Sequence, residues 1–171
     1  YRQSQQFDLA ADAALVCLDW MTSGRRARGE RWAFDEYRTR LAVRAGGDVV
    51  CYDAVTLSAD DGPLVERFDR FDVLATVAIV GPAFREACER LIAGQAQRAV
   101  ERRAGLVMAV SALTSAGALV RIAGRTGEDV GRAVLALMAG HRVELVLTGP
   151  VWDGAVDLDA VLVAEGLEHL F

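Results

Sequence analysis

Two short segments of the sequence repeat the same pair of potentially metal-binding side chains. Cys17-Leu18-Asp19 and Cys51-Tyr52-Asp53 both place a thiol two residues before a carboxylate, in segments that we expect to be β-strands. Because side chains alternate between the two faces of a strand, each thiol shares a face with its carboxylate. The other positions of those faces are mostly apolar, so Asp19 and Asp53 are expected to face the same interior space.

A carboxylate among apolar side chains costs several kcal/mol unless it has a partner, hydrogen bonds or contact with water. Under a structural interpretation, each aspartate is paired with an arginine and each cysteine acts as a small apolar side chain. Under a functional interpretation, the two carboxylates line a hydrated path. For the cysteines we favour the structural interpretation; for the aspartates both stay open.

Arginines gather in the segment that follows Asp19. Between residues 25 and 44 the chain carries seven arginines against three acidic residues, a local charge of +4. Such a segment is either a recognition surface for an acidic partner or a solvated loop and strand face. All 19 basic residues of the chain are arginines, so their choice over lysine carries little information.

The sequence lacks the usual motifs of catalysis. It contains no glycine-rich phosphate loop, no GxSxG motif and no HExxH motif, and its two histidines lie at positions 141 and 169. We therefore expect that the chain is not an enzyme.

Hydrophobic periodicity predicts strands in the first half and a mixed order in the second. Residues 1–58 read as an antiparallel β-meander, with a hairpin turn at residues 45–48. The second half reads as strand, helix, strand, strand, helix, and Thr126 is expected to cap the second helix. Core-facing stripes are expected on both helices, the first made of Phe84, Ala87, Cys88, Leu91 and Ile92.

Composition narrows the class of protein. At 171 residues with 53% hydrophobic content, the chain is long enough for one domain with a sizeable core. A net charge of −5 argues against bulk nucleic-acid binding, and no apolar run is long enough for a membrane span. Three widely spaced cysteines favour a reducing compartment, so we expect the cytoplasm.

One stretch of the chain resembles the urease accessory protein UreD family, also called UreH. The matching residues are Leu18-Asp19-Trp20-Met21-Thr22-Ser23-Gly24-Arg25, then Arg28-Gly29-Glu30, then Trp32 and Phe34. Weaker support continues through residues 51–57, 71–82 and 119–124. The resemblance covers residues 1–140, as a UreD-like β-rich domain that matches the C-terminal half of the family. It implies a chain truncated at its N-terminus, with a divergent, poorly ordered tail over residues 141–171.

The resemblance also implies a fold and a function. The fold would be mainly β with two α-helices and layered antiparallel sheets. The function would be that of a urease maturation factor, which scaffolds UreF-like and UreG-like proteins on apo-urease and helps to conduct nickel to the active site. Nickel would be in transit, with no tightly bound cofactor. Asp19 and Glu30 carry over from the family motif as nickel-path residues, and Asp53 carries over by its strand position.

The sequence supports three further expectations about contacts and function. The local positive charge makes Arg25, Arg26 and Arg28 candidate contacts to a partner. A first alternative function is a pure interaction scaffold through which no metal passes. A second is a small hydrolase that uses Asp19 and Glu30 as an acid/base pair.

Overall fold

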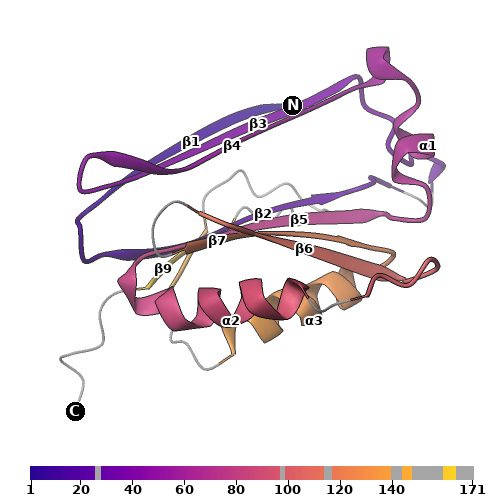
Figure 1. The fold of residues 1–171 in the computed structure, drawn as a ribbon. Coiled ribbons are helices and arrows are strands. Elements are labelled where there is room, and N and C mark those ends of the chain that lie inside the picture. Colours follow the sequence, from indigo (N-terminus) through magenta and orange to yellow (C-terminus); the bar gives the residue numbers. More distant parts are fainter. Residues whose placement is uncertain (26–27, 97–98, 114–116, 140–143, 148–159, 165–171) are drawn as a thin grey trace.

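The chain forms two stacked β-sheets, with two long helices on the outer face of the larger sheet (Figure 1). The computed structural model describes residues 1–25, 28–96, 99–113, 117–139, 144–147 and 160–164. The mainly β class with layered antiparallel sheets, predicted from the sequence, is confirmed.

The smaller sheet contains three strands in the order β1-β3-β4. These are β1 (Arg2–Leu9), β3 (Glu36–Ala45) and β4 (Asp48–Ser58). Strands β3 and β4 form the predicted hairpin, whose turn places Gly46 and Gly47 at positive φ. Strand β1 pairs with β3 in parallel, so the antiparallel meander predicted for residues 1–58 is wrong. The reason is that the next strand leaves this sheet and joins the other one.

In the described part of the chain, the larger sheet contains six strands in the order β6-β7-β5-β2-β9-β8, and all neighbours are antiparallel. Its central strands are β2 (Ala14–Thr22), β5 (Val73–Val80) and β7 (Gly117–Gly124), flanked by β6 (Leu106–Ala112), β9 (Ala160–Ala164) and β8 (Glu144–Leu147). The small sheet covers one face of β2 and the apolar core on the helix side covers the other. This position explains the uninterrupted apolar run at the start of β2.

Strands β8 and β9 belong to the segment predicted as a separate tail. The rest of residues 141–171 lies outside the described residues, so the division of the chain at residue 140 stays a prediction.

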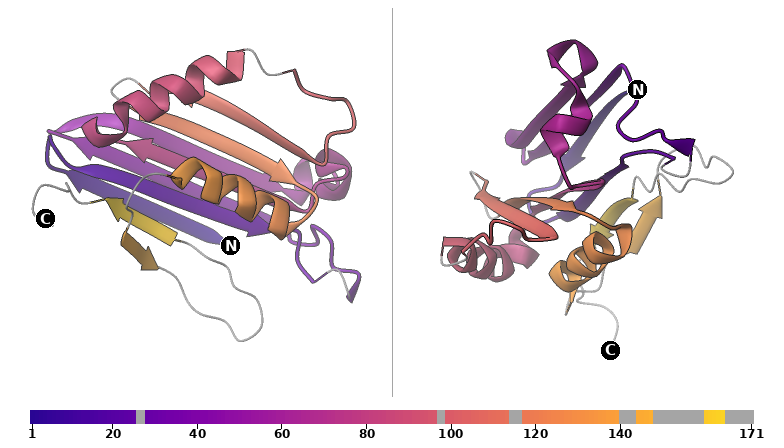
Figure 2. Two further views of the ribbon diagram at one scale, coloured as in Figure 1. Left: turned by 90° about the horizontal axis from the view of Figure 1, so that it is seen from below. Right: turned by 90° about the vertical axis from the view of Figure 1, so that its right-hand side faces the viewer.

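Two long helices cover the outer face of the large sheet (Figure 2). They are α2 (Arg85–Ala96), which follows the short 3-10 turn η3 (Pro82–Phe84), and α3 (Gly127–Met138). The predicted cap of α3 is confirmed: the Asp129 amide donates to the Thr126 hydroxyl at 3.1 Å. The predicted α2 stripe is confirmed in part, since Phe84 and Cys88 are buried and Leu91 packs against the same cluster.

A short connection between the two sheets was not predicted as helical. It contains the 3-10 turn η2 (Ala59–Asp61) and the five-residue helix α1 (Leu64–Phe68). Because α1 has only five residues, it is too short for a helical pattern of apolar residues to be recognised in the sequence. Leu64 nevertheless buries its side chain at the end of the space between the sheets.

Gly81 allows the chain to pass from β5 into the first helical turn. Its φ is +118°, and a Cβ atom there would lie 2.5 Å from the Ala13 carbonyl oxygen and 2.6 Å from the Ala14 Cα. Both features require glycine at the point where this segment crosses the start of β2.

Candidate functional site

Polar side chains cross the space between the two sheets. Apolar clusters fill both ends of this space, one around Leu15 and Val43 and the other around Trp32 and Leu57. Between them, six strands contribute polar residues, which we call the polar belt: Gln3, Gln5, Asp19, Thr39, Asp53, Thr76 and Arg121.

Strand register explains why these residues meet. In the large sheet, Asp19 on β2 lies opposite Thr76 on β5, and Thr76 lies opposite Arg121 on β7. The three residues therefore form one row across the sheet and share its inner face, because aligned residues of neighbouring strands point the same way.

The small sheet contributes the remaining polar residues, which face this row across the space between the sheets. Gln5, Leu41 and Asp53 are aligned across its three strands, and Gln3 and Thr39 are aligned one step further along. The two sheets thus bring polar positions together from segments separated by more than a hundred residues.

Asp19 accepts hydrogen bonds from the opposite sheet. The Tyr37 hydroxyl of β3 lies 3.1 Å from Asp19 Oδ1 and 3.3 Å from Oδ2. The Tyr37 ring stacks on Tyr1 with ring centroids 5.3 Å apart. The carboxylate on the large sheet is therefore held by a neutral donor that is itself fixed by packing.

Asp53 lies on the small sheet, and its hydrogen-bond donor comes from the large sheet. Arg121, on the large sheet, donates from Nη2 to Asp53 Oδ1 on the small sheet, forming an ion pair. Asp53 therefore does pair with an arginine, as the structural interpretation of this residue predicts. Each carboxylate of the belt binds a donor of the opposite sheet, so the two contacts also join the sheets.

Two small cavities lie beside Asp19. The first, of about 10 Å³, is lined by both Asp19 and Asp53, together with Thr39 and Thr76; the second, of about 40 Å³, is lined by Asp19 and Tyr37 among others. The expectation that the two carboxylates face one interior space is confirmed. The first cavity has room for about one water molecule, so the belt is narrow as it stands.

The cysteines of the two Cys-x-Asp pairs are buried beside the belt. Cys17 Sγ donates to Gln5 Oε1 at 3.8 Å, and Cys51 packs in the apolar cluster around Val43. Burial raises the pKa of the Cys51 thiol, and the nearby Asp53 carboxylate raises it further. Cys51 is therefore a neutral thiol at neutral pH, which is a poor metal ligand.

Glu30 does not join Asp19 and Asp53. It lies in the loop after β2 and binds Arg25 through two contacts, Arg25 Nε to Glu30 Oε2 at 2.8 Å and Arg25 Nη2 to Glu30 Oε1 at 3.1 Å. Neither cavity beside Asp19 has Glu30 in its lining. The structure therefore assigns Glu30 and Arg25 to closing this loop.

The other arginines of the same loop have different surroundings. Arg28 is exposed, whereas Arg26 lies outside the described residues. Arg31 turns inward: its Nε lies 2.5 Å from Asp72 Oδ1, and it also donates to the carbonyl oxygens of Asp69 and Phe71. This anchoring role was missed in the sequence, where Arg31 was counted only as part of a positive run.

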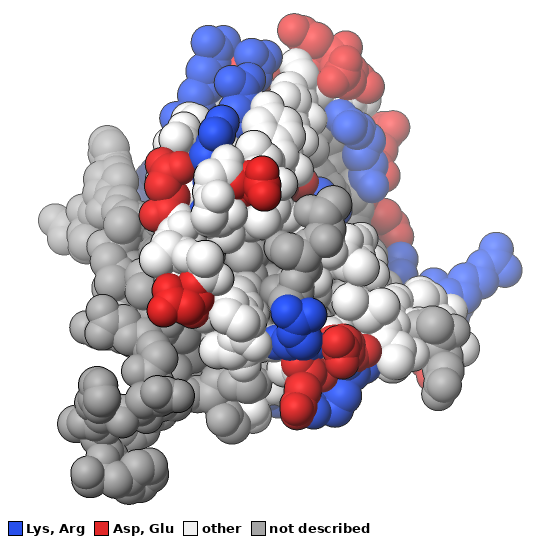
Figure 3. All heavy atoms as spheres, turned by 60° about the vertical axis from the view of Figure 1, so that its left-hand side comes forward, with Lys and Arg blue, Asp and Glu red and all other residues white. Residues whose placement is uncertain are grey.

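The outer face of the small sheet carries the remaining arginines of that run. Arg38, Arg40 and Arg44 alternate along β3 and are exposed, and Figure 3 shows basic side chains gathered over this sheet. Glu36 neutralises part of the charge, because it accepts hydrogen bonds from Arg2 at 2.8 Å and from Arg38 at 3.0 Å. An exposed row of arginines fits both interpretations of this segment, a solvated strand face and a recognition surface.

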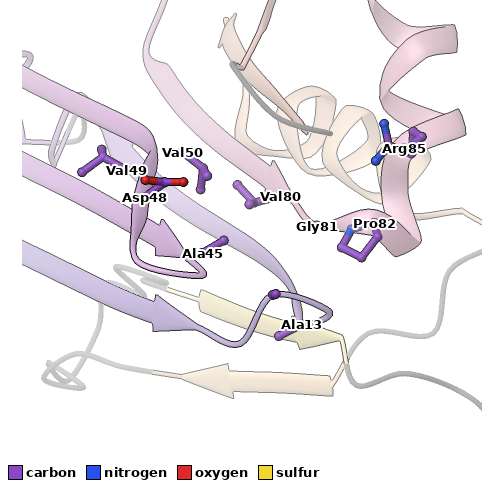
Figure 4. A pocket seen from close by; sticks show the side chains of 10 residues that line it. Ala13, Ala45, Asp48, Val49, Val50, Val80, Gly81, Pro82 and Arg85 are labelled. Atoms are coloured by element: carbon purple, nitrogen blue, oxygen red, sulfur yellow. The ribbon is translucent and has the colours of Figure 1, made fainter.

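A larger cavity of about 440 Å³ opens at one end of the space between the sheets (Figure 4). Asp48 at the hairpin and Arg85 at the start of α2 lie on different walls, and Val50 and Val80 are buried beneath them. The apolar cluster around Val43 separates this cavity from the polar belt. Among the described residues that line it, the charged side chains are those of Asp48 and Arg85.

The described residues lack a metal-binding cluster and a membrane-spanning helix. No three His, Cys, Asp or Glu side chains of the described part of the chain lie together in a way that would hold a metal ion. Among the same residues, no helix has both the length and the apolar character to cross a membrane.

Comparison with known proteins gives consistent results. A family model described as UreD urease accessory protein matches residues 1–152. The chain is 47% identical over 144 residues to the urease accessory protein UreD of Sorangium cellulosum, covering 82% of this chain and 46% of that protein. It is 45% identical over 129 residues to the UreD of an Anaeromyxobacter species, covering 75% and 43% respectively.

A plant protein matches as well. Urease accessory protein D of Arabidopsis thaliana is 35% identical over 88 residues, covering 50% of this chain and 30% of that protein. The chain spans about half the length, or less, of these curated relatives. Their names describe accessory proteins and not enzymes, in agreement with the expectation from the missing catalytic motifs.

Proposed function

We propose that this chain, which belongs to the UreD urease accessory protein family, acts in the maturation of urease and conducts nickel through the polar belt between its two sheets. Asp19 and Asp53 are the acidic residues of that path. The observation that carries this proposal is that both carboxylates line one cavity in the interior, although they come from opposite sheets.

The chemistry of the belt suits transport better than storage. Carboxylates and water bind nickel more weakly than imidazole or thiolate does, so a cation held by Asp19 and Asp53 can leave again. The surrounding amides and hydroxyls of Gln3, Gln5 and Thr39 offer further oxygen atoms to a partly hydrated cation. Within the described part of the chain, Asp19 and Asp53 are the acidic side chains that line the two cavities.

The proposed partners are UreF-like and UreG-like accessory proteins and apo-urease, in the cytoplasm. The family supports the partners, and so do the exposed arginines of the chain itself. The three widely spaced cysteines support the cytoplasm. Arg28 on the loop and Arg40 and Arg44 on the small sheet offer positive charge to an acidic partner surface.

The scaffold alternative is supported by a specific observation. Both carboxylates make contacts that join the two sheets, Asp19 with Tyr37 and Asp53 with Arg121. Under this alternative the contacts only stabilise the fold and no metal passes. The hydrolase alternative lacks such support, because the described structure leaves Glu30 paired with Arg25 and outside the cavities that Asp19 lines.

An isosteric substitution separates transport from scaffolding. Asp19→Asn and Asp53→Asn keep the size of the side chain and remove its charge. We expect each variant to assemble with its partners and apo-urease normally, and to lower the nickel content of the activated urease several-fold. Asp48→Asn is the matched control, since Asp48 is an exposed carboxylate on the same strand as Asp53 but outside the belt.

Nickel content and complex assembly are measured on the same samples, by metal analysis and by size-exclusion chromatography. Normal nickel content in both belt variants would contradict nickel conduction and leave the scaffold. A loss of assembly in either variant would assign that carboxylate to the structure of the complex.

A further inference from the structure

The ion pair between Arg121 and Asp53 places a fixed positive charge beside the proposed cation path. The Asp53 side chain is 13% exposed and the Arg121 side chain is 48% exposed, so the pair extends from the interior to the solvent. Arg121 also belongs to the row of the large sheet that contains Asp19 and Thr76. One guanidinium group therefore binds one carboxylate of the belt and lies in line with the other.

A divalent cation and Arg121 compete for the same carboxylate. The guanidinium donates to Asp53 Oδ1, which is an oxygen that a metal ion would bind. Binding of both at once would place a doubly charged cation and a guanidinium within a few ångströms of each other, where their repulsion is costly. The cavity that Asp53 lines is also too small for a hydrated cation beside the guanidinium.

The geometry points to Arg121 as the resident counter-ion of Asp53, a positioning residue that keeps the affinity of the polar belt for a divalent cation low. This inference rests on the proposed function. When a cation reaches Asp53, the half-exposed guanidinium turns into solvent, which costs little for a long side chain that is already hydrated. When Arg121 returns, it displaces the cation and favours its release.

The two carboxylates then differ in a testable way. Asp19 is held by the neutral hydroxyl of Tyr37, which adds no charge against a cation. Asp53 is held by a full positive charge. Removal of Arg121 should therefore strengthen cation binding, and this effect should depend on Asp53.

The test is Ni²⁺ binding to the full chain, measured by equilibrium dialysis with metal analysis. We expect Arg121→Gln to lower the dissociation constant for Ni²⁺ by about 3- to 10-fold, as the loss of one repelling charge near the solvent predicts. In an Asp53→Asn background, Arg121→Gln should have no effect. Arg44→Gln is the matched control, because it removes an exposed positive charge on the outer face of the small sheet.

Each result supports or overturns the inference. Unchanged or weaker binding in Arg121→Gln, while Asp53→Asn still weakens binding, would overturn it and leave the proposed function standing. An equal gain in both backgrounds would also overturn it, because a general structural effect does not require Asp53. No change in either Asp19→Asn or Asp53→Asn would contradict the proposed function itself.

A second variant covers the case in which Arg121→Gln does not fold, as judged by thermal unfolding. Arg121→Lys keeps the charge but replaces the planar fork with a shorter side chain that carries a compact ammonium group, so its hold on Asp53 is weaker. We expect its dissociation constant for Ni²⁺ to lie measurably below that of the unsubstituted chain. An equal dissociation constant would overturn the inference.

Discussion

The two interlayer spaces of this molecule are built differently, although they share the large sheet. Between that sheet and the helices α2 and α3, the buried side chains form one apolar cluster that includes Val16, Val77, Val120 and Val130. Between the two sheets, apolar clusters fill only the ends, and charged and amide side chains occupy the middle. A middle layer of that kind gives up apolar burial, so we assign most of the stability to the helix side. The space between the sheets is where the proposed cation path lies.

The largest effect on stability is expected on the helix side. Phe84 is 3% exposed and packs in the apolar cluster beneath the helices. Phe84→Ala should lower the free energy of unfolding by about 3–5 kcal/mol, because it removes a large buried ring and leaves a cavity. Chemical denaturation measures this loss. A loss below about 1 kcal/mol, the size expected for an exposed site, would break the contrast between the two spaces.

A second strong effect is expected at Gly81, between β5 and the helical turn that follows it. In Gly81→Ala, the new Cβ atom would clash with backbone atoms of Ala13 and Ala14, at a φ that disfavours side chains. The variant should lose at least about 2 kcal/mol of unfolding free energy, the scale of one strained backbone position. Gly47→Ala is the control: its φ is also positive, but no atom lies within 4 Å of its added Cβ. Equal losses in the two variants would show that the close approach at Gly81 contributes nothing.

Within the polar belt, the effect on stability should be smaller. Tyr37→Phe removes the hydroxyl that donates to Asp19 and keeps the ring that stacks on Tyr1. A loss of about 1.5 kcal/mol is expected, the lower end for a hydrogen bond to a charged group, because this contact is only partly buried. Thermal and chemical unfolding give this number. A loss as large as that of Phe84→Ala would mean that the belt contributes to stability as much as the apolar core does.

The smallest effect concerns the outer surface of the small sheet. The hydrogen bond from Arg2 lowers the pKa of Glu36 below the ordinary 4.5; burial acts in the opposite direction, and the charges of Arg2 and Arg38 assist the lowering. Because the folded-state pKa is lowered, Glu36 stabilises the fold above its ordinary pKa, and this contribution is lost as the pH falls through the lowered value.

The comparison of Glu36→Gln with the unsubstituted chain tests this sign. The variant should have a slightly lower melting temperature at pH 7, and the difference should shrink as the pH falls below about 4. A difference that grows on acidification would show that the lowering of the pKa is assigned with the wrong sign.

Strands β1 to β7 and the two long helices could be predicted from the sequence, because each carries a local signal; β8 and β9 lie in the segment predicted as a tail and were not predicted. The alternation in β3, the glycine turn before β4 and the Thr126 cap are properties of neighbouring residues. The parallel pairing of β1 with β3 could not be predicted. Phe7 and Leu9 would face an apolar interior in either sheet, and nothing in the short turn before β2 specifies that the chain changes sheets.

For the candidate site as well, the sequence predicted the local placement of residues but not their partners on the other sheet. The two-residue period placed Asp19 and Asp53 on inner faces, which the structure confirms. Their partners Tyr37 and Arg121 were not predictable, because each lies on the opposite sheet and meets its carboxylate only through tertiary packing. Glu30 was grouped with Asp19 through the family motif alone, which carries no information on distance.

The most direct test of the central claim, that the polar belt carries nickel, is to locate the ion itself. A crystal of the chain soaked in Ni²⁺ and measured at the nickel absorption edge should show anomalous scattering between β2 and β4, within bonding distance of a carboxylate oxygen of Asp19 or Asp53, about 2.0–2.2 Å by analogy with other divalent ions. The signal should weaken in the Asp19→Asn and Asp53→Asn variants. Anomalous scattering confined to the molecular surface, with none between the two sheets, would contradict the account.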